Sequence, residues 1–172
     1  MNLKETLASI KPVDQGLRAS AQHRMDFKTK PLGSLGALEE LAVRMALIQN
    51  RLDPAVGHKM SFVFAGDHGI AEEGVSAFPA AVTPQMVLNF LGGGAAINVL
   101  CRHYGIAMHV VDMGVNFDFP KGTVLLDHKV RKGTRNFLKE AALTREEAIS
   151  ALEGGMAVFE EAFAQKPIDL VG

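Results

Sequence analysis

Runs of consecutive apolar residues alternate along the chain with segments in which apolar positions recur every three or four residues. Residues 59–66 (KMSFVFAG), 106–114 (IAMHVVDMG) and 168–172 (IDLVG) are mostly apolar and lack a polar alternation. Runs of this kind are typical of strands that are covered on both faces in a parallel sheet. The sequence therefore predicts three buried strands.

Helical spacing predicts two helices before the first strand. Residues 35–52 carry an apolar stripe that Asp53 and Pro54 end, and an earlier helix follows Asp14, which we expect to be its N-terminal cap. The segment KPLGSLG separates the two helices, because its proline and glycines resist helix continuation.

Further helices are predicted between the strands. Thr83 is a favourable N-cap residue with Pro84 after it, and the helix that they begin ends at the glycines of residues 92–94. A second helix then runs to Gly105. After the second strand, residues 143–165 begin with a capping box and continue with apolar residues at helical spacing.

This order of elements predicts a three-layer α/β fold, a Rossmann-like parallel sheet with helical crossovers. We expect residues 36–172 to form the N-terminal part of a large α/β domain, and residues 1–35 to be a helical segment of a small domain. Residues 115–140 stay open, because GTVLLDHKV suits an added strand or an ordered loop. The last strand has no helix after it, so we expect either a partner that covers it or a truncated chain.

Composition narrows the function classes. The chain has 172 residues, 48% of them hydrophobic, and 18 basic residues against 19 acidic ones. This balance provides no basic stripe for a nucleic acid. Cys101 is the single cysteine, which excludes a disulfide framework within the chain. We see no uninterrupted apolar segment of about 18 residues, so we expect a cytoplasmic protein without a membrane partner.

The first two predicted strands deliver chemically active side chains to one edge of the sheet. Asp67 and His68 follow the first strand, and Asp112 and Asn116 lie at the end of the second. Ligands of open parallel sheets bind at this edge. Asp67 is either a functional carboxylate or an acceptor of backbone N–H groups in a glycine-flanked turn, and His68 is either a catalyst or a structural histidine.

Three other features have alternative interpretations. A divalent-metal site could combine Asp67, His68 and Asp112 with Glu72 or Glu73, although no helical H-E-x-x-H spacing is present. The GGGAAIN segment could present backbone N–H groups to an anion or make a turn between two helices. Gln85, one turn into its helix, could point across the crevice or into solvent.

Four stretches together resemble one enzyme family. KPLGSLGALEELA, FAGDHGIAEEGVSAFPAAVTPQMVLNFLGGGAAINVL, VVDMGVN and DLVG occur in this order from residue 30 to residue 172. They are similar to the N-terminal half of the nicotinate-nucleotide:dimethylbenzimidazole phosphoribosyltransferases, which act in cobalamin lower-ligand synthesis. Ala37 departs from the family, in which a basic residue is more frequent at this position. Family members are also longer, and continue into a Gly- and Thr-rich phosphate loop and a catalytic glutamate.

The resemblance implies a reaction and a set of site residues. The family transfers a 5-phosphoribosyl group from nicotinate mononucleotide to 5,6-dimethylbenzimidazole, which gives α-ribazole 5′-phosphate and nicotinate. It implies that the substrate-binding residues, which line the benzimidazole pocket, are Gln85, Ser76, Ala77 and Phe78. The residues that it implies to organise the strand-end loops are Asp67, His68, Gly69 and Asp112.

The same resemblance implies no metal or other cofactor, and a homodimer. It places the catalytic base beyond Gly172, so that we expect the isolated 172-residue chain to be inactive. Two alternatives remain beside it. The chain could be a non-catalytic binding or assembly module, or a divalent-metal hydrolase that uses Asp67 and His68.

Overall fold

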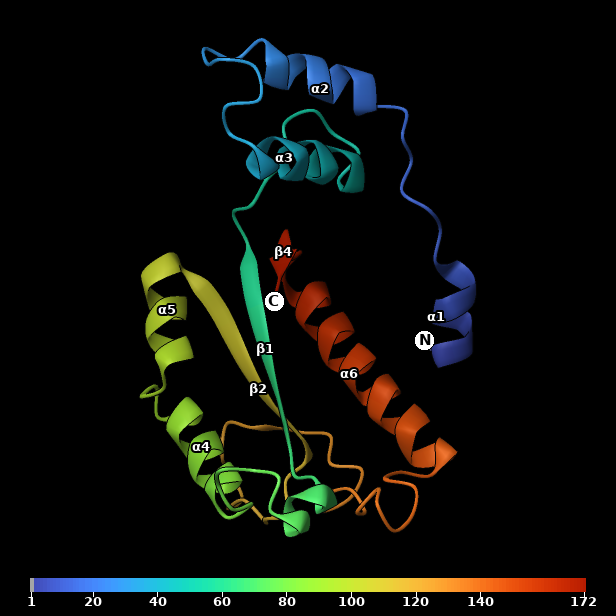
Figure 1. Ribbon diagram of the computed structural model, residues 1–172, viewed down its shortest axis with the longest axis vertical. Coiled ribbons are helices and arrows are strands. Elements are labelled where there is room, and N and C mark those ends of the chain that lie inside the picture. The colour runs from blue at the N-terminus through green and yellow to red at the C-terminus, as the bar shows by residue number, and fades with distance from the viewer. Residues whose placement is uncertain (1) are drawn as a thin grey trace. The chain divides into compact units, whose positions relative to one another are not determined.

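A computed structural model describes residues 2–172 of the chain (Figure 1), which form two compact units. One unit comprises Thr6–Val56. The other comprises Gly57–Gly172 together with the start of the chain up to Glu5. The short helix α1 (Leu3–Ser9), which the sequence analysis did not predict, crosses the boundary between them.

The smaller unit is built from helix α2 (Arg18–Asp26) and helix α3 (Ala37–Ile48). Its buried apolar cluster joins Ala21 of α2 to Val43, Ala46 and Leu47 of α3. Since these two helices share one core, the observed boundary lies after Val56, whereas the sequence predicted it after residue 35.

The predicted ends of these two helices need correction. The Oδ1 atom of Asp14 accepts a hydrogen bond from the Gly16 N–H at 3.0 Å, so Asp14 closes a local turn, and α2 begins later, at Arg18. Helix α3 ends at Ile48, ahead of Asp53 and Pro54. The Arg51 N–H donates to the carbonyl of Ala46, five residues earlier, and Asn50 has a positive φ of 49°, which together close the helix.

The larger unit is built on a parallel sheet of four strands in the order β3-β2-β1-β4. Strand β1 (Lys59–Gly66) and strand β2 (Ile106–Gly114) coincide with the first two predicted runs. Strand β4 (Leu170–Val171) lies in the third run. Within residues 115–140, only Leu126 and Asp127 pair with β2, as strand β3 (Leu126–Asp127), and the other residues of this segment lie outside strands.

Helices cover both faces of the sheet, which confirms the three-layer α/β prediction (Figure 1). Helix α4 (Val82–Leu91) and helix α5 (Ala96–Tyr104) pack on one face, where Val87 joins Val110 and Ala65 in the core. Helix α6 (Arg145–Gln165) packs on the other face, where the ring centroids of Phe62 and Phe159 are 6.2 Å apart. Neighbouring residues of one strand therefore serve opposite layers.

Two predicted caps have different outcomes. Thr83 is not the cap of α4, which begins at Val82, because backbone bonds from Val82 to Pro79 and from Thr83 to Ala80 already form the turn that enters the helix. The capping box of α6 is confirmed, since the Thr144 hydroxyl accepts from the Glu147 N–H at 3.1 Å and the Glu147 carboxylate accepts from the Thr144 N–H at 2.7 Å.

By length and composition, the segment Val82–Tyr104 could cross a membrane. In the fold, however, it is divided into α4 and α5, and residues of both helices belong to the buried side of the α/β unit, among them Val87 and Cys101. A core helix of a globular domain passes the same test of apolar content, so a single segment of this kind is weak evidence for a membrane span.

Candidate functional site

The end of β1 lies where three cavities meet. Their volumes are about 550, 360 and 220 Å³, and Asp67 and His68 line all three. Because the carboxyl ends of β1 and β2 reach the same edge of a parallel sheet, this is the edge at which the sequence analysis expected a ligand. Of these three cavities, the one of 550 Å³ is bounded mainly by apolar side chains, and the one of 360 Å³ by more polar ones.

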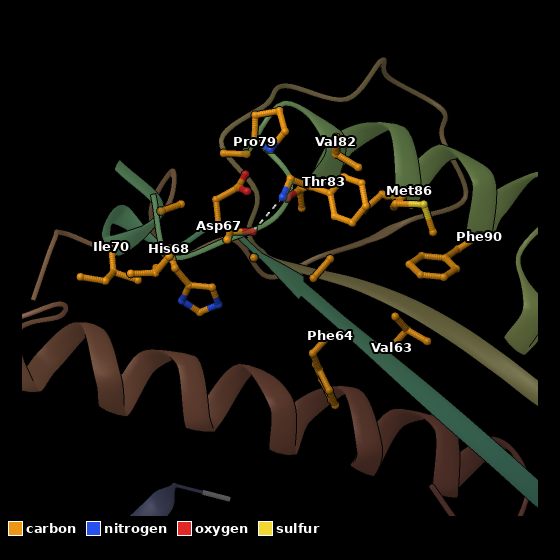
Figure 2. A pocket seen from close by; sticks show the side chains of 18 residues that line it. Val63, Phe64, Asp67, His68, Ile70, Pro79, Val82, Thr83, Met86 and Phe90 are labelled. Atoms are coloured by element: carbon orange, nitrogen blue, oxygen red, sulfur yellow. Dashed lines mark hydrogen bonds between the residues drawn. The ribbon is translucent and has the colours of Figure 1, made fainter. Parts of the chain in front are cut away.

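The apolar cavity, as we call the 550 Å³ space, lies between β1, η1 (a 3-10 helix, Gly69–Glu73) and α4. Figure 2 shows Met86 and Phe90 of α4 facing Val63 of β1 across it. Val82, Thr83 and Val87 line it from the same helix. These α4 positions follow one helical face, so the cavity wall is set by the periodicity of the helix.

The structure brings two of the four predicted pocket residues to this cavity. Ser76 and Phe78 line it, and the Ser76 hydroxyl accepts a hydrogen bond from the Phe78 N–H at 3.3 Å. Gln85 is exposed, and the residues that line the cavity include neither Gln85 nor Ala77. Gln85 lies off the cavity-facing stripe of α4, one residue before Met86.

The sequence analysis missed the main apolar walls, Met86 and Phe90. Their spacing with Val82 and Val87 was available as a signal, because these positions form one face of a helix that starts at the edge of the site. The sequence pattern alone identified these residues only as part of a helix that connects two strands.

Asp67 is tied into the backbone at the end of the strand. Its side chain is buried, and its Oδ2 atom accepts from the Asn116 N–H at 2.7 Å. Its own N–H donates to the Gly114 carbonyl at 3.0 Å, and its carbonyl accepts from the Thr134 N–H at 2.9 Å. Asp67 thus joins three loops, which agrees with the alternative that its carboxylate accepts backbone N–H groups.

Gly69 lies where the same loops approach most closely. A Cβ atom at this position would come within 2.6 Å of backbone atoms of Thr134, Arg135 and Asn136. The Gly69 N–H donates to the Thr134 carbonyl at 3.1 Å. Glycine is therefore required by the backbone contact itself, since any side chain would separate the two loops.

Asp112 is the centre of a buried ion pair. Its carboxylate is 1% exposed, and its Oδ1 atom accepts from the N–H groups of Gly114 and Val115 at 3.0 and 2.8 Å. Its Oδ2 atom lies 2.8 Å from Nζ of Lys129. Lys129 also donates to the carbonyls of Val115 and Phe117, at 2.7 and 2.6 Å, so the pair fixes the loop that follows β2.

The backbone and the side chain of His68 have different surroundings. Its carbonyl accepts from the Ala71 N–H at 3.0 Å, where η1 begins, while its side chain is exposed. In Figure 2 the imidazole lies on the side of the strand that faces α6. Among residues 2–172, no group of three or more His, Cys, Asp or Glu side chains is arranged to hold a metal ion, so the geometry gives no support to the metal-hydrolase alternative.

The GGGAAIN segment makes the turn between α4 and α5. Gly93 has a φ of +77°, and the Asn98 side chain accepts from the Ala95 N–H and donates to the Phe90 carbonyl. Because the Asn98 side chain bonds to the end of α4 and to the residue that precedes α5, this segment is explained as a helix–helix connection. Cys101 of α5 is buried, as expected for a small core residue.

An ion pair connects the site loops to α6. Nη1 and Nη2 of Arg135 donate to the two carboxylate oxygens of Glu147 at 2.6 and 3.0 Å. The Arg135 guanidinium, followed by the hydrogen bond from the Thr144 N–H, lowers the pKa of Glu147 to about 2. The carboxylate is thus held ionised at the N-terminus of the helix, where negative charge is favourable.

This pKa predicts a pH dependence of stability. Since the pKa of Glu147 is lower in the folded state than its usual 4.5, its contribution is present above pH 4.5 and is lost as the pH falls towards 2. We expect Glu147→Gln to lower the melting temperature at pH 7 and to flatten its decrease between pH 4.5 and 2. Melting temperatures of both proteins across this range test the prediction, with Glu161→Gln on exposed α6 surface as control. Parallel curves for Glu147→Gln and the parent would contradict it.

Comparisons with known proteins place the chain among enzymes. Residues 10–172 match a family model described as phosphoribosyltransferase. The chain is 56% identical over 170 residues to the nicotinate-nucleotide–dimethylbenzimidazole phosphoribosyltransferase of Geobacter sp. (strain M21), covering 99% of this chain and 48% of the relative. The corresponding protein of Chlorobaculum parvum is 49% identical over 162 residues, which cover 94% of this chain and 46% of that relative.

Solved structures agree with these relatives. The crystal structure of CobT from Thermus thermophilus superposes with a TM-score of 0.85 at 46% identity, covering 90% of this chain and 46% of that one. A second structure, of the nicotinate-nucleotide–dimethylbenzimidazole phosphoribosyltransferase of the same organism, gives a TM-score of 0.87 at 46% identity and covers 92% and 48%. The chain thus spans about half the length of the curated relatives it matches.

Proposed function

Because the chain belongs to the nicotinate-nucleotide:dimethylbenzimidazole phosphoribosyltransferase family, we propose that it carries part of the base-binding pocket of such an enzyme. The reaction is the transfer of a 5-phosphoribosyl group from nicotinate mononucleotide to 5,6-dimethylbenzimidazole, for cobalamin biosynthesis. The observation that carries this proposal is the apolar cavity of about 550 Å³ at the carboxyl end of β1. Its size and apolar lining suit a flat bicyclic ring.

The chemistry defines what this pocket must do. A ring nitrogen of the benzimidazole forms a bond to C1 of the ribose, and the bond from C1 to the nicotinate nitrogen breaks, with its electron pair leaving on nicotinate. The second ring nitrogen then loses its proton to a base. The binding residues contribute by holding the ring so that its nitrogen faces C1 of the ribose. The two reactants then no longer have to meet in the correct orientation by chance, which lowers the entropic part of the barrier.

Walls from two sides favour one orientation of the ring. Val63 of β1 and Met86 and Phe90 of α4 face each other across the cavity (Figure 2), so a flat ring that enters it is sandwiched between them. Ser76 and Phe78 lie on the loop that borders the opening. We assign Phe78, which is 70% exposed, to the rim, where its ring can close over a bound base.

Gln85 and Ala77 remain proposed pocket residues on the grounds of the resemblance alone. Gln85 is exposed on α4 beside Met86, from where its amide could meet a ring nitrogen near the cavity opening. In this proposal Gln85 selects the base by a hydrogen bond and contributes little to nucleotide affinity. Replacing it by methionine should therefore change the preference among benzimidazoles more than the affinity for nicotinate mononucleotide.

Truncation of the apolar wall tests the proposed pocket. We expect Met86→Ala to weaken binding of 5,6-dimethylbenzimidazole about tenfold, since it removes apolar contact area on one face of the ring. Isothermal titration of the base into both proteins measures the effect. Leu88→Ala is the matched control, because Leu88 is 46% exposed on the same helix and does not line the cavity. Equal affinities for the parent and Met86→Ala would place the base elsewhere.

The remaining features of the proposal come from the family resemblance. We propose that the base that removes the ring proton lies outside residues 1–172, so that this chain alone forms no measurable α-ribazole 5′-phosphate. Asp67, which accepts a backbone N–H bond, and the exposed His68 have organising roles in this account. We also propose a cytoplasmic homodimer without a metal or other cofactor, whose oligomeric state sedimentation equilibrium can measure.

A further inference from the structure

We propose that the polar cavity beside the base pocket binds an oxyanion of the nucleotide substrate, with Lys132 as its main cationic contact. This inference rests on the proposed function, because it takes the neighbouring apolar cavity as the base pocket. The polar cavity is the space of about 360 Å³ that shares Asp67, His68, Ala71, Pro79 and Ala80 with the apolar cavity. A ligand that spans both spaces would therefore pass the end of β1.

The lining of the polar cavity supplies hydrogen-bond donors. Lys132, His68, Thr134 and Asn116 line it, and each has a side chain that can donate a hydrogen bond to an oxyanion. The Thr134 hydroxyl oxygen accepts from the Gly69 N–H at 3.2 Å, which leaves its O–H free to point at a ligand. Together these side chains favour a phosphate or carboxylate over a neutral group.

The backbone that follows Lys132 is held in place by two hydrogen bonds. Gly133, with a φ of +67°, donates its N–H to the Gly114 carbonyl at 2.8 Å, and the Thr134 N–H donates to the Asp67 carbonyl at 2.9 Å. These bonds attach residues 133 and 134 to the ends of both central strands. Lys132 thus projects from a fixed turn, so that less conformational freedom is lost when its ammonium contacts a ligand.

Basic residues gather in the chain segment that contributes Lys132 to the polar cavity. Residues 129–135 (KVRKGTR) contain four basic residues and no acidic one. Two carboxylates also line the polar cavity: Asp67, whose Oδ2 atom accepts from the Asn116 N–H, and Glu72, which forms an exposed ion pair with Lys139 at 3.3 Å. Lys129 is held by buried Asp112, which leaves Lys132 as the lysine that lines the cavity.

The present partner of Lys132 can be exchanged for a ligand. Lys132 pairs with Asp118, whose side chain is 79% exposed and does not line the cavity. Exposed ion pairs of this kind contribute little to stability, because water screens both charges. An oxyanion inside the cavity, which meets several donors at once, should therefore displace Asp118.

Nicotinate mononucleotide offers two groups with this chemistry, the 5′-phosphate and the ring carboxylate. Inorganic phosphate and nicotinate, used as separate probes, distinguish the two. Titrations of 15N-labelled protein with each probe, and with nicotinate mononucleotide, report binding through the amide signals of Lys132, Gly133 and Thr134. The group whose probe shifts these signals is the one that occupies the polar cavity.

Three variants test the role of Lys132. We expect Lys132→Ala to weaken binding of nicotinate mononucleotide about tenfold, as is usual for the loss of a hydrogen bond to a charged group. Asp118→Asn should strengthen it, because the competing carboxylate is removed, and this gain should vanish in the double variant Lys132→Ala Asp118→Asn. Lys121→Ala, at an exposed lysine that does not line the cavity, is the matched control and should leave the affinity unchanged.

The outcomes separate this inference from the proposed function. If 5,6-dimethylbenzimidazole still binds in the apolar cavity while Lys132→Ala leaves the nucleotide affinity unchanged, the inference fails and the base pocket stands. The inference also fails if neither phosphate nor nicotinate shifts the signals of residues 132–134. If the base does not bind in the apolar cavity, the proposed function itself fails.

Discussion

Replacing Asp112 by alanine is expected to destabilise the protein by about 3–5 kcal/mol, because it leaves a largely buried ammonium without its counter-charge. Asp112 is 1% exposed, and its partner Lys129 is 16% exposed. The substitution also removes the acceptor of the Gly114 and Val115 N–H groups, which belong to the end of β2 and the loop after it. Urea unfolding of the parent and the variant measures the change in the free energy of unfolding.

The surrounding residues provide a control and a second test. Asp118→Ala removes an exposed carboxylate from the neighbouring ion pair, so it should leave the free energy of unfolding nearly unchanged. In the double variant Asp112→Ala Lys129→Met no unpaired ammonium remains, and its destabilisation should be clearly smaller than the sum of the two single losses. Additive effects would mean that the two side chains do not act as a pair.

Replacing Gly69 by alanine is expected to cost about 3 kcal/mol and to weaken binding of 5,6-dimethylbenzimidazole. The added methyl group would meet backbone atoms of residues 134–136 at 2.6 Å, and backbone cannot move aside as a flexible side chain can. The loop of η1 or the loop of residues 134–136 must therefore shift. Since Ile70 and Ala71 line the apolar cavity, the shift reaches the proposed base pocket.

Gly155→Ala is a control in which the same substitution should raise the stability instead of lowering it. Gly155 lies inside α6, where an added Cβ would approach only a ring carbon of Phe64, at 3.9 Å. Alanine is favoured over glycine inside a helix by about 0.5–1 kcal/mol, so this variant should be slightly more stable than the parent. A Gly69→Ala variant as stable as the parent would show that the two loops are not in close contact.

The sequence predicted the central strands well, because their signal is local. The runs at residues 59–66 and 106–114 are the observed bounds of β1 and β2. A strand that is covered on both faces carries apolar residues at nearly every position, so its pattern is visible in the sequence whatever packs on it. The predicted burial is incomplete in the structure, because β1 is only half-buried and Phe64 is 51% exposed. The order of elements then left parallel pairing with helical layers as the simplest arrangement, and the sheet confirms it.

The differences between the predictions and the structure concern features that depend on distant contacts. The division after Val56 results from the core that Ala21 shares with Val43, which no local pattern reveals. Thr83 is a favourable cap by residue type. The turn formed by residues 79–83, however, lets α4 begin one residue before Thr83, at Val82. Residues 115–140 are held in part by bonds to other segments, such as those of Lys129 to Asp112 and of Thr134 to Asp67.

The site could be located from the sequence but not detailed. The rule that ligands bind beyond the carboxyl ends of parallel strands identified the edge at Asp67 and His68. The cavity walls depend on which face of α4 points at the sheet, and this face contains Met86 and Phe90 and leaves Gln85 outside. The binding roles of Ser76, Ala77, Phe78 and Gln85 remain predictions that ligand titrations can test.

The most direct test of the central claim is to locate 5,6-dimethylbenzimidazole on the protein by intermolecular nuclear Overhauser effects. We predict contacts from the ring and methyl protons of the base to the Met86 methyl group and to the side chains of Val63 and Phe90, which enclose the apolar cavity. Contacts to other surfaces only, or none at a base concentration that saturates binding, would contradict the assignment of this cavity as the base pocket.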